Sequence, residues 1–169
     1  MHTTELEGDM WTIPGARYKT KLDHVVPLTD AVRTLISGKA QGANGNSWFV
    51  FSTTFGAKAF SGFSKAKREL DKAIAEIRDK AGRMPLENWT LHDLRRTARS
   101  LMSRAKVPTD HAERVLGHVI GGVRETYDRY EYLKEKHDAL LALAGLIDRI
   151  LNPAGDNVVA MPDRQAATG

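Results

Sequence analysis

His92 and Arg95 are the first residues whose types and spacing could do chemistry. They stand three residues apart in a stretch with helical periodicity, so their side chains share one face of the expected helix. An arginine held by a helix can donate two parallel hydrogen bonds to a phosphate, which a lysine cannot match. A basic helix face exposed to solvent, with a histidine whose ring nitrogens are hydrogen-bonded, has the same pattern. For this pair taken alone, that structural interpretation is the stronger one.

His118 and Tyr127 form a second candidate pair further along the chain. His118 follows a Leu-Gly pair at a predicted helix end, where a histidine can cap the helix, carry a proton or donate to a phosphate. A tyrosine phenol has an ordinary pKa of about 10 and becomes a nucleophile only beside cations or a base. Tyr130 and Tyr132 lie close by, so this chemistry alone does not choose among the three tyrosines. An aromatic helix packed into the core is the plainer alternative.

A basic loop over residues 17–21, with the sequence RYKTK, is the last candidate. It lies between two short apolar runs, MWTI and HVVPL, which predict a β-hairpin with a long connection. The tip of a hairpin can place one lysine, Lys19 or Lys21, over a reaction centre. In the plainer interpretation the charges protect the edge of the sheet from aggregation.

Several classes of site are excluded by what the sequence lacks. There is no cysteine, which excludes a disulfide framework, a thiolate metal site and a cysteine nucleophile. No HExxH motif, carboxylate cluster at ligand spacing, Walker loop or dinucleotide fingerprint is present. We therefore expect neither a metal nor a cofactor.

The composition of the 169 residues is that of a globular protein, with 41% hydrophobic and 27% charged residues. The formal net charge of +4 permits a nucleic-acid partner without proving one. No run approaches the twenty apolar residues of a membrane span, and the N-terminus lacks a secretory signal. The expected compartment is the cytoplasm.

The candidate residues must be positioned by a small β-sheet followed by helices, which is a mainly α fold with an antiparallel hairpin (α+β). We expect one domain over 1–151, with the hairpin at about 9–28, a helical part at about 63–151 and a flexible tail over 152–169. WFVF predicts a short strand or extended segment. Helices are expected over 30–37, 63–80, 91–105 and 111–116, and one or two more within 123–151.

The ends of two helices carry local signals. Thr90 and Asp93 have the spacing of a capping box at the start of the helix over 91–105. Thr109 or Asp110 is the expected N-cap of the next helix, and Gly117 is expected to end it. The last helix is rich in leucine and isoleucine, and we expect it to pack within the molecule rather than on a neighbouring copy.

In their order and spacing these signals resemble the tyrosine recombinases, and specifically phage-type integrases. The resemblance rests on WTLHDLRRTARSLMSRAKV, then LGH, then nine residues to a tyrosine. MWTIPGARYKTKLDHVVPLTDAV is similar to the β-hairpin of the same family, and NSWFVFSTTFGAKAFSGFSKAK is similar to integrases of the pathogenicity-island type. The resemblance covers roughly residues 9–150 and implies the catalytic-domain fold of that family.

The resemblance implies a set of catalytic residues. Tyr127 is preferred to its neighbours because it alone has the family's spacing from His118. Lys19 is preferred to Lys21 by its offset before the HVVPL strand. The set is Lys19, His92, Arg95, His118 and Tyr127.

One departure concerns another catalytic arginine of the family, in a sequence like Gly-Leu-Arg-x-Gly-Glu, which precedes the sheet. The first arginine here is Arg17, inside the expected hairpin. The family's N-terminal DNA-clamping domain has no counterpart either. We therefore expect the C-terminal part of an integrase, lacking the first helices of the catalytic domain and inactive alone.

The implied activity is site-specific recombination by cleavage and rejoining of DNA through a 3′-phosphotyrosyl link, without a metal or a nucleotide cofactor. The implied partners are double-stranded DNA, at the bacterial nucleoid, and further copies of the chain in a tetramer on DNA, with the isolated fragment a monomer. A non-catalytic helical DNA-binding module is the alternative. Phosphate contacts are expected from Lys21, Arg96, Arg99, Arg104 and Lys106.

Overall fold

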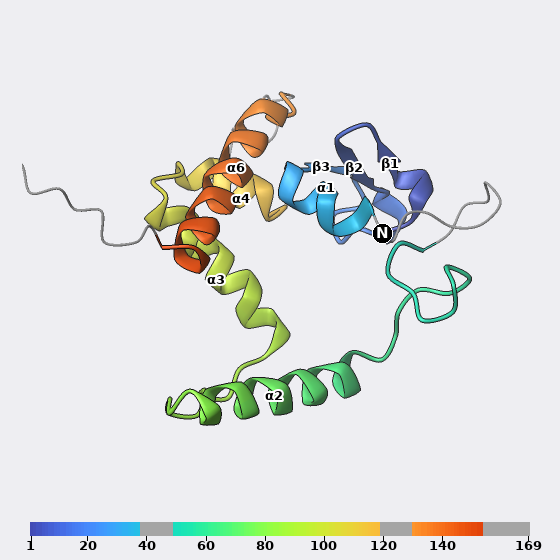
Figure 1. The fold of residues 1–169 in the computed structure, drawn as a ribbon. Helices are drawn as coiled ribbons and strands as arrows, with labels where there is room; N and C mark the ends of the chain where they lie inside the picture. The colour runs from blue at the N-terminus through green and yellow to red at the C-terminus, as the bar shows by residue number, and fades with distance from the viewer. Residues whose placement is uncertain (38–48, 119–129, 154–169) are drawn as a thin grey trace, which may run out of the picture.

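The computed structural model describes residues 1–37, 49–118 and 130–153 of the chain (Figure 1). Tyr127 and most of the expected tail lie outside these residues. Figure 1 shows a small sheet with helix α1 on one side and a group of three helices, α3, α4 and α6, beside it. The predicted mainly α fold with a small antiparallel sheet is confirmed.

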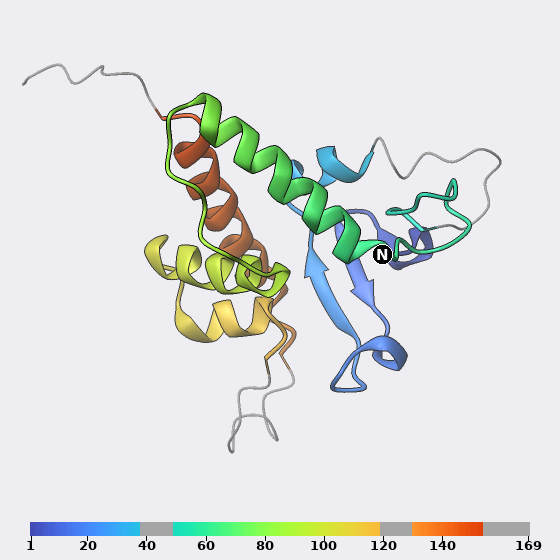
Figure 2. The same ribbon diagram turned by 90° about the horizontal axis from the view of Figure 1, so that it is seen from below.

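The sheet has three antiparallel strands in the order β1-β2-β3: Leu6–Glu7, Met10–Ile13 and His24–Pro27 (Figure 2). The predicted hairpin is formed by β2 and β3, in a register that pairs Trp11 with Val26 and Ile13 with His24. Two short 3₁₀ helices flank β1 and β2, at Thr3–Glu5 and Gly15–Arg17. The two-residue strand β1 is not predicted from the sequence, because it is too short to show an alternating pattern.

A small apolar core lies between the sheet and α1 (Asp30–Ser37). The segment WFVF, predicted as a short strand or an extended segment, forms a single bridge, from Phe49 to His2. Its neighbour Val50 is nonetheless buried, so the segment contributes to the core without extending the sheet. The residues of this core are Leu28, Ile36 and Val50, with Met1, Leu6 and Trp11 packed against them.

The last helix, α6 (Leu133–Leu151), joins the two parts of the molecule. It packs on α3 (Leu91–Arg104), on α4 (Thr109–Val115) and on strand β3 of the same chain. Lys136 of α6 donates a hydrogen bond from Nζ to the carbonyl oxygen of Val25, at 3.1 Å. The buried residues of the helical part are Met102, Ala112, Ala139 and Leu146.

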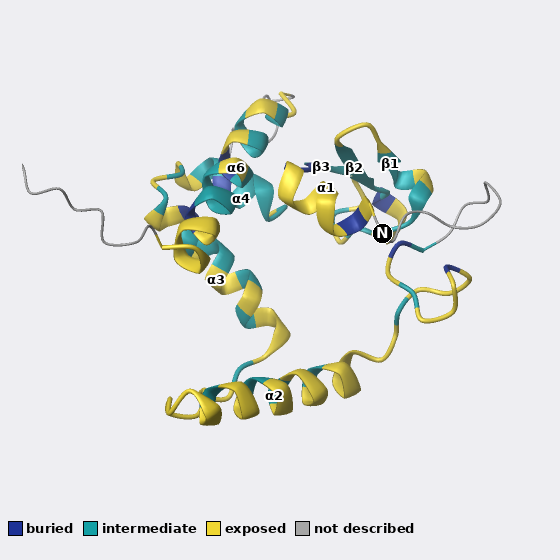
Figure 3. Ribbon diagram, viewed as in Figure 1, coloured by how far each residue is buried: buried dark blue, intermediate teal, exposed yellow. Residues whose placement is uncertain are grey.

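Helix α2 (Phe63–Lys80) has the predicted bounds but lies apart from the other helices (Figures 1 and 3). The helix face that carries Leu70 and Ile77 is largely open: Ile77 is 67% exposed, and Leu70 is also exposed. Its contact with the rest of the chain includes Lys67, whose Nζ lies 3.9 Å from the centroid of the Trp89 ring.

The start of α4 differs from the prediction. The helix begins at Thr109, with Pro108 as its N-cap, so neither Thr109 nor Asp110 caps it. The proline has φ −54° and ψ 139°, an extended conformation that a proline adopts readily before a helix. Its ring holds the chain in the conformation that a capping residue needs, which makes Thr109 the first helical residue.

No helix in the described parts of the chain is both long and apolar enough to cross a membrane.

Met102 is expected to be a main source of stability for the helical part, because its side chain is 0% exposed. The substitution Met102→Ala should lower the free energy of unfolding by about 2–5 kcal/mol, since it removes buried methylene groups and leaves a cavity. Met84, which is 80% exposed, provides the matched control, and Met84→Ala should change stability by less than about 0.5 kcal/mol. Urea unfolding followed by circular dichroism measures both, and equal effects would contradict the described packing.

Candidate active site

Helix α3 carries Arg95, and the predicted capping box fixes its first turn. Asp93 accepts hydrogen bonds from the backbone N–H of Thr90 at 2.9 Å and from the Thr90 hydroxyl at 2.8 Å. Arg96 Nη1 donates to the same carboxylate at 2.9 Å. These bonds, from Thr90 first and then Arg96, lower the pKa of Asp93 to about 2. The start of α3 is therefore held by an ionised carboxylate at neutral pH, and this sets the face on which Arg95 projects.

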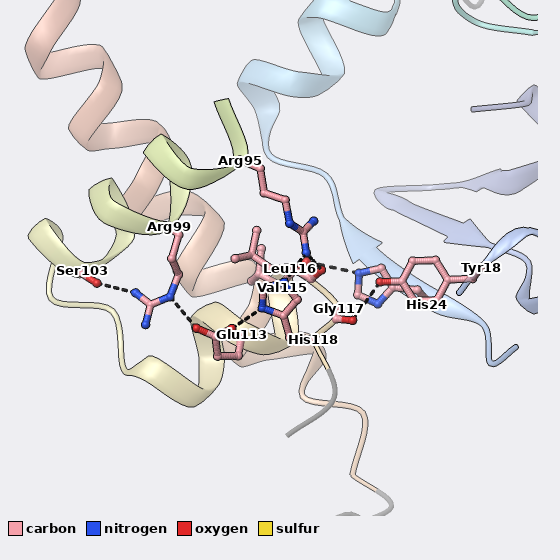
Figure 4. A network of polar contacts seen from close by, with 10 residues as sticks. All are labelled: Tyr18, His24, Arg95, Arg99, Ser103, Glu113, Val115, Leu116, Gly117 and His118. Carbon is pink, nitrogen blue, oxygen red and sulfur yellow. Dashed lines mark hydrogen bonds and ion pairs between the residues drawn. The ribbon is translucent and has the colours of Figure 1, made fainter. Parts of the chain in front are cut away.

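Arg95 contacts the turn that follows α4 (Figure 4). Its Nη2 lies 2.5 Å from the carbonyl oxygen of Leu116 and 2.8 Å from Nε2 of His118. Two residues predicted for the site, separated by 23 positions and carried by different elements, therefore meet.

Three consecutive carbonyl groups in this turn receive side-chain donors from three different segments. The oxygens of Val115, Leu116 and Gly117 accept from His24 Nε2 at 3.3 Å, from Arg95 and from the Tyr18 hydroxyl at 3.3 Å, respectively (Figure 4). The last carbonyls of a helix have no partner inside it, so these donors satisfy groups that would otherwise need water.

Tyr18 and His24 reach the turn as a stacked pair, with ring centroids 4.9 Å apart and planes 8° from parallel. Burial lowers the pKa of His24, and the positive charge of Lys136 adds to this effect. The ring is therefore neutral at neutral pH, and its Nε2–H donates to Val115. This pair links the hairpin to the turn that carries His118.

His118 is held on its other ring nitrogen by Glu113 of α4. Its side chain is 51% exposed, and Nδ1 contacts the Glu113 carboxylate. The other oxygen of that carboxylate accepts from Arg99 Nε at 2.7 Å. Hydrogen bonds from His118 and then Arg99 lower the pKa of Glu113. The imidazole thus sits at the protein surface between a guanidinium and a carboxylate.

The other predicted catalytic residues are not joined to this cluster by a hydrogen bond within the described part of the chain. His92 is exposed on α3, one turn before Arg95. Lys19 is exposed in the hairpin loop, next to Tyr18. Tyr127 lies outside the described residues.

The residues predicted to contact phosphate fall into two groups. Arg96 and Arg99 form ion pairs, with Asp93 and Glu113 respectively. The others are exposed and make no ion pair within residues 1–37, 49–118 and 130–153: Lys21, Arg104 and Lys106.

Three residues of the site are not found from the sequence: Tyr18, His24 and Glu113. Tyr18 and His24 make contacts that span 99 and 91 positions, and no local pattern predicts such pairs. For Glu113 the sequence does hold one signal of its contact with His118, because it precedes this residue by five positions across a helix end. A side chain there can reach the residue that follows the turn.

The cluster presents hydrogen-bond donors and positive charge. Arg95 has donors besides Nη2, and a planar guanidinium can bind a phosphate oxygen pair through two of them. Among the described residues, no group of three histidine or acidic side chains could hold a metal ion. It is the guanidinium of Arg95 that enables the cluster to bind an oxyanion.

Gly117 is expected to be essential for the turn. Its φ is +66°, and a Cβ atom there would lie 1.6 Å from the Tyr18 hydroxyl oxygen and 2.8 Å from its ring. Gly117→Ala must strain the backbone and also displace Tyr18, so we expect it to lower the free energy of unfolding by more than the roughly 1–2 kcal/mol of the backbone effect. Gly82→Ala is the matched control, because Gly82 has φ +62° with nothing within 4 Å. Equal losses in urea unfolding would contradict the close contact with Tyr18.

Comparison with known proteins places this cluster in a family. The phage integrase family matches residues 1–136, a span that contains every residue of the cluster. No curated protein and no solved structure matched the chain. Since the match covers well over half of the 169 residues, the chain belongs to the phage integrase family.

Proposed function

We propose that this chain cleaves and rejoins double-stranded DNA through a covalent 3′-phosphotyrosyl intermediate. Membership of the phage integrase family implies DNA binding and site-specific recombination. The finer proposal assigns Tyr127 as the nucleophile, Arg95 and His118 as donors to the phosphate, Lys19 as the general acid and His92 as the proton acceptor for the tyrosine.

The meeting of Arg95 with His118 carries this proposal. The two residues expected to bind the same phosphate come from α3 and from the turn after α4, and their side-chain nitrogens lie 2.8 Å apart. A single phosphate placed beside them is within reach of both. A basic helix face that is only exposed to solvent would not require Arg95 and His118 to meet.

The proposed cleavage step uses one nucleophile, one proton acceptor and one proton donor, all from this chain. The Tyr127 oxygen attacks the phosphorus in line and passes its proton to His92. The bond from phosphorus to the 5′-oxygen breaks, and that oxygen takes a proton from Lys19. Negative charge that develops on the non-bridging oxygens is stabilised by Arg95 and His118. The energy of the broken ester is kept in the new one, so rejoining is the reverse reaction and needs no cofactor.

The contact of the hairpin with the His118 turn supports the role of Lys19. Tyr18 donates to the carbonyl of Gly117, the residue before His118, and Lys19 is the next residue after Tyr18. The loop that carries the lysine is thereby fixed near the proposed phosphate site. Lys21, two residues further, is the second candidate for the general acid.

The family resemblance also implies a second catalytic arginine, in a sequence like Gly-Leu-Arg-x-Gly-Glu, and we propose that efficient cleavage needs such an arginine in addition to Arg95. Recombination joins ends from separate duplexes, so we propose that copies of the chain assemble on DNA.

The direct test of strand cleavage incubates the complete gene product with duplex DNA from the organism that carries the gene. The expected result is a protein–DNA adduct that survives SDS. Binding without any adduct would instead favour the non-catalytic DNA-binding module.

Binding of DNA is expected to weaken with salt and to depend on Arg104 and Lys106. The double variant Arg104→Gln, Lys106→Gln removes two exposed cations, so the slope of log affinity against log salt should become shallower by about 2. Fluorescence anisotropy of a labelled duplex across a salt series measures this slope. The matched control removes two exposed lysines of α2, Lys65→Gln and Lys72→Gln, and should leave the slope unchanged. Equal slopes in the two variants would contradict the proposed DNA face.

A further inference from the structure

The carboxylate of Glu113 lies behind His118, on the side of the ring away from Arg95 (Figure 4). One of its oxygens contacts His118 Nδ1, and the other accepts from Arg99 Nε at 2.7 Å. Arg99 is itself held by the Ser103 hydroxyl on the next turn of α3. The imidazole is thus connected through Glu113 to a rigid helix, an arrangement that limits its rotation.

The same contacts determine which ring nitrogen carries the proton. A guanidinium has donors and no acceptor, so Nε2 of His118, at 2.8 Å from Arg95 Nη2, must accept. A neutral imidazole has one N–H, which therefore sits on Nδ1 and donates to Glu113. The carboxylate is suited to this role, because its lowered pKa keeps it an acceptor at neutral pH.

We infer that Glu113 is a positioning residue, which holds His118 in the Nδ1–H tautomer so that Nε2 faces the DNA phosphate. The inference rests on the proposed function, from which the phosphate role of His118 comes. It also gives Arg99 a different task from direct phosphate contact, since its Nε is directed to Glu113.

The bond from His118 Nδ1 to Glu113 also determines how His118 can act as a donor to phosphate. Nε2 has no hydrogen in the DNA-free structure, so it must take one proton from solvent before it can donate to a phosphate oxygen. Arg95 is then free to turn from Nε2 to the same phosphate. The Nδ1–H bond to Glu113 persists, and the carboxylate offsets the charge of the imidazolium. Carboxylates that orient a catalytic histidine in other enzymes contribute up to about 10⁴ in rate through the same effect.

The tautomer is measured directly by two-bond ¹H–¹⁵N NMR of the DNA-free chain at a pH where the imidazole is neutral. The His118 signals are identified by their absence in His118→Asn. We expect Nδ1 to be protonated and Nε2 bare in the natural sequence and in Glu113→Asp. Because Arg95 alone favours the same form, Glu113→Met is compared in an Arg95→Ala background, where the Nδ1–H form should lose its dominance. Glu76→Met, which removes the same charge from the exposed face of α2, should leave His118 unchanged.

A second arm measures adduct formation by the complete gene product. Glu113→Met should slow the rate at saturating DNA by about 10²-fold, because a small misplacement of a catalytic group has an effect of this size. Glu113→Asp should recover part of the rate, and urea unfolding checks that each variant is folded.

The outcomes separate the two proposals. An Nε2–H tautomer in the natural sequence, or an Nδ1–H form that stays dominant when Glu113→Met is combined with Arg95→Ala, would overturn the inference. An unchanged rate of adduct formation in Glu113→Met would also overturn it. The expected tautomers without any adduct from the natural sequence would refute strand cleavage, while the orientation of His118 by Glu113 would stand.

Discussion

Replacing Tyr127 with phenylalanine is expected to abolish the covalent link between protein and DNA and to leave DNA binding intact. The substitution removes only the oxygen that attacks phosphorus, and loss of a nucleophile lowers the rate by more than about 10³-fold. Phosphate contacts by the basic side chains do not involve this oxygen, so affinity should not change. The measurement is the amount of SDS-resistant adduct formed by the complete gene product, with binding followed separately by anisotropy.

Tyr130 provides the matched control for this experiment. It lies three residues from Tyr127, its side chain is exposed and its ring packs edge-on against Tyr132. Tyr130→Phe keeps the ring and should form adduct at the rate of the natural sequence. The assignment of the nucleophile would be refuted if Tyr127→Phe still formed adduct, or if Tyr130→Phe did not.

Replacing Arg95 is the second change with a large expected effect. Arg95→Ala should slow adduct formation by about 10²–10³-fold, since it removes a donor to the charge that develops on the phosphate. Arg95→Lys keeps the positive charge but lacks the planar guanidinium that donates two parallel hydrogen bonds. Compared with Arg95→Ala, we therefore expect it to restore DNA affinity more fully than the rate of adduct formation. Single-turnover rates at saturating DNA separate the two effects.

Arg95 also bonds to the Leu116 carbonyl, so its loss removes a contact that supports the His118 turn. Urea unfolding of Arg95→Ala measures that structural part. Arg96→Ala is the matched control, because the neighbouring guanidinium is exposed and paired with Asp93. This variant should cleave at nearly the natural rate, and an equal loss in both variants would show that Arg95 has no special place at the phosphate.

The agreement between sequence and structure is best where the signal is local. The helices at Phe63–Lys80 and Leu91–Arg104 and the hairpin strands were all predictable from periodicity, with small errors at their ends. The predicted N-cap of α4 is wrong, because the fixed φ of Pro108 outweighs the preference of threonine and aspartate for cap positions. The single bridge at Phe49 depends on distant His2, and no window of sequence contains both residues.

By itself, the sequence determined the elements and the order of the chemical groups: His-x-x-Arg on one helix, Leu-Gly-His at the end of another, and a tyrosine nine residues later. These are local properties, set by backbone preference and by spacing along the chain. Only the tertiary structure decided that Arg95 meets His118, that Tyr18 and His24 support the same turn, and that Glu113 joins His118 to Arg99. Such contacts form between elements far apart in the chain, where the packing of α6 against α3, α4 and β3 sets the distances.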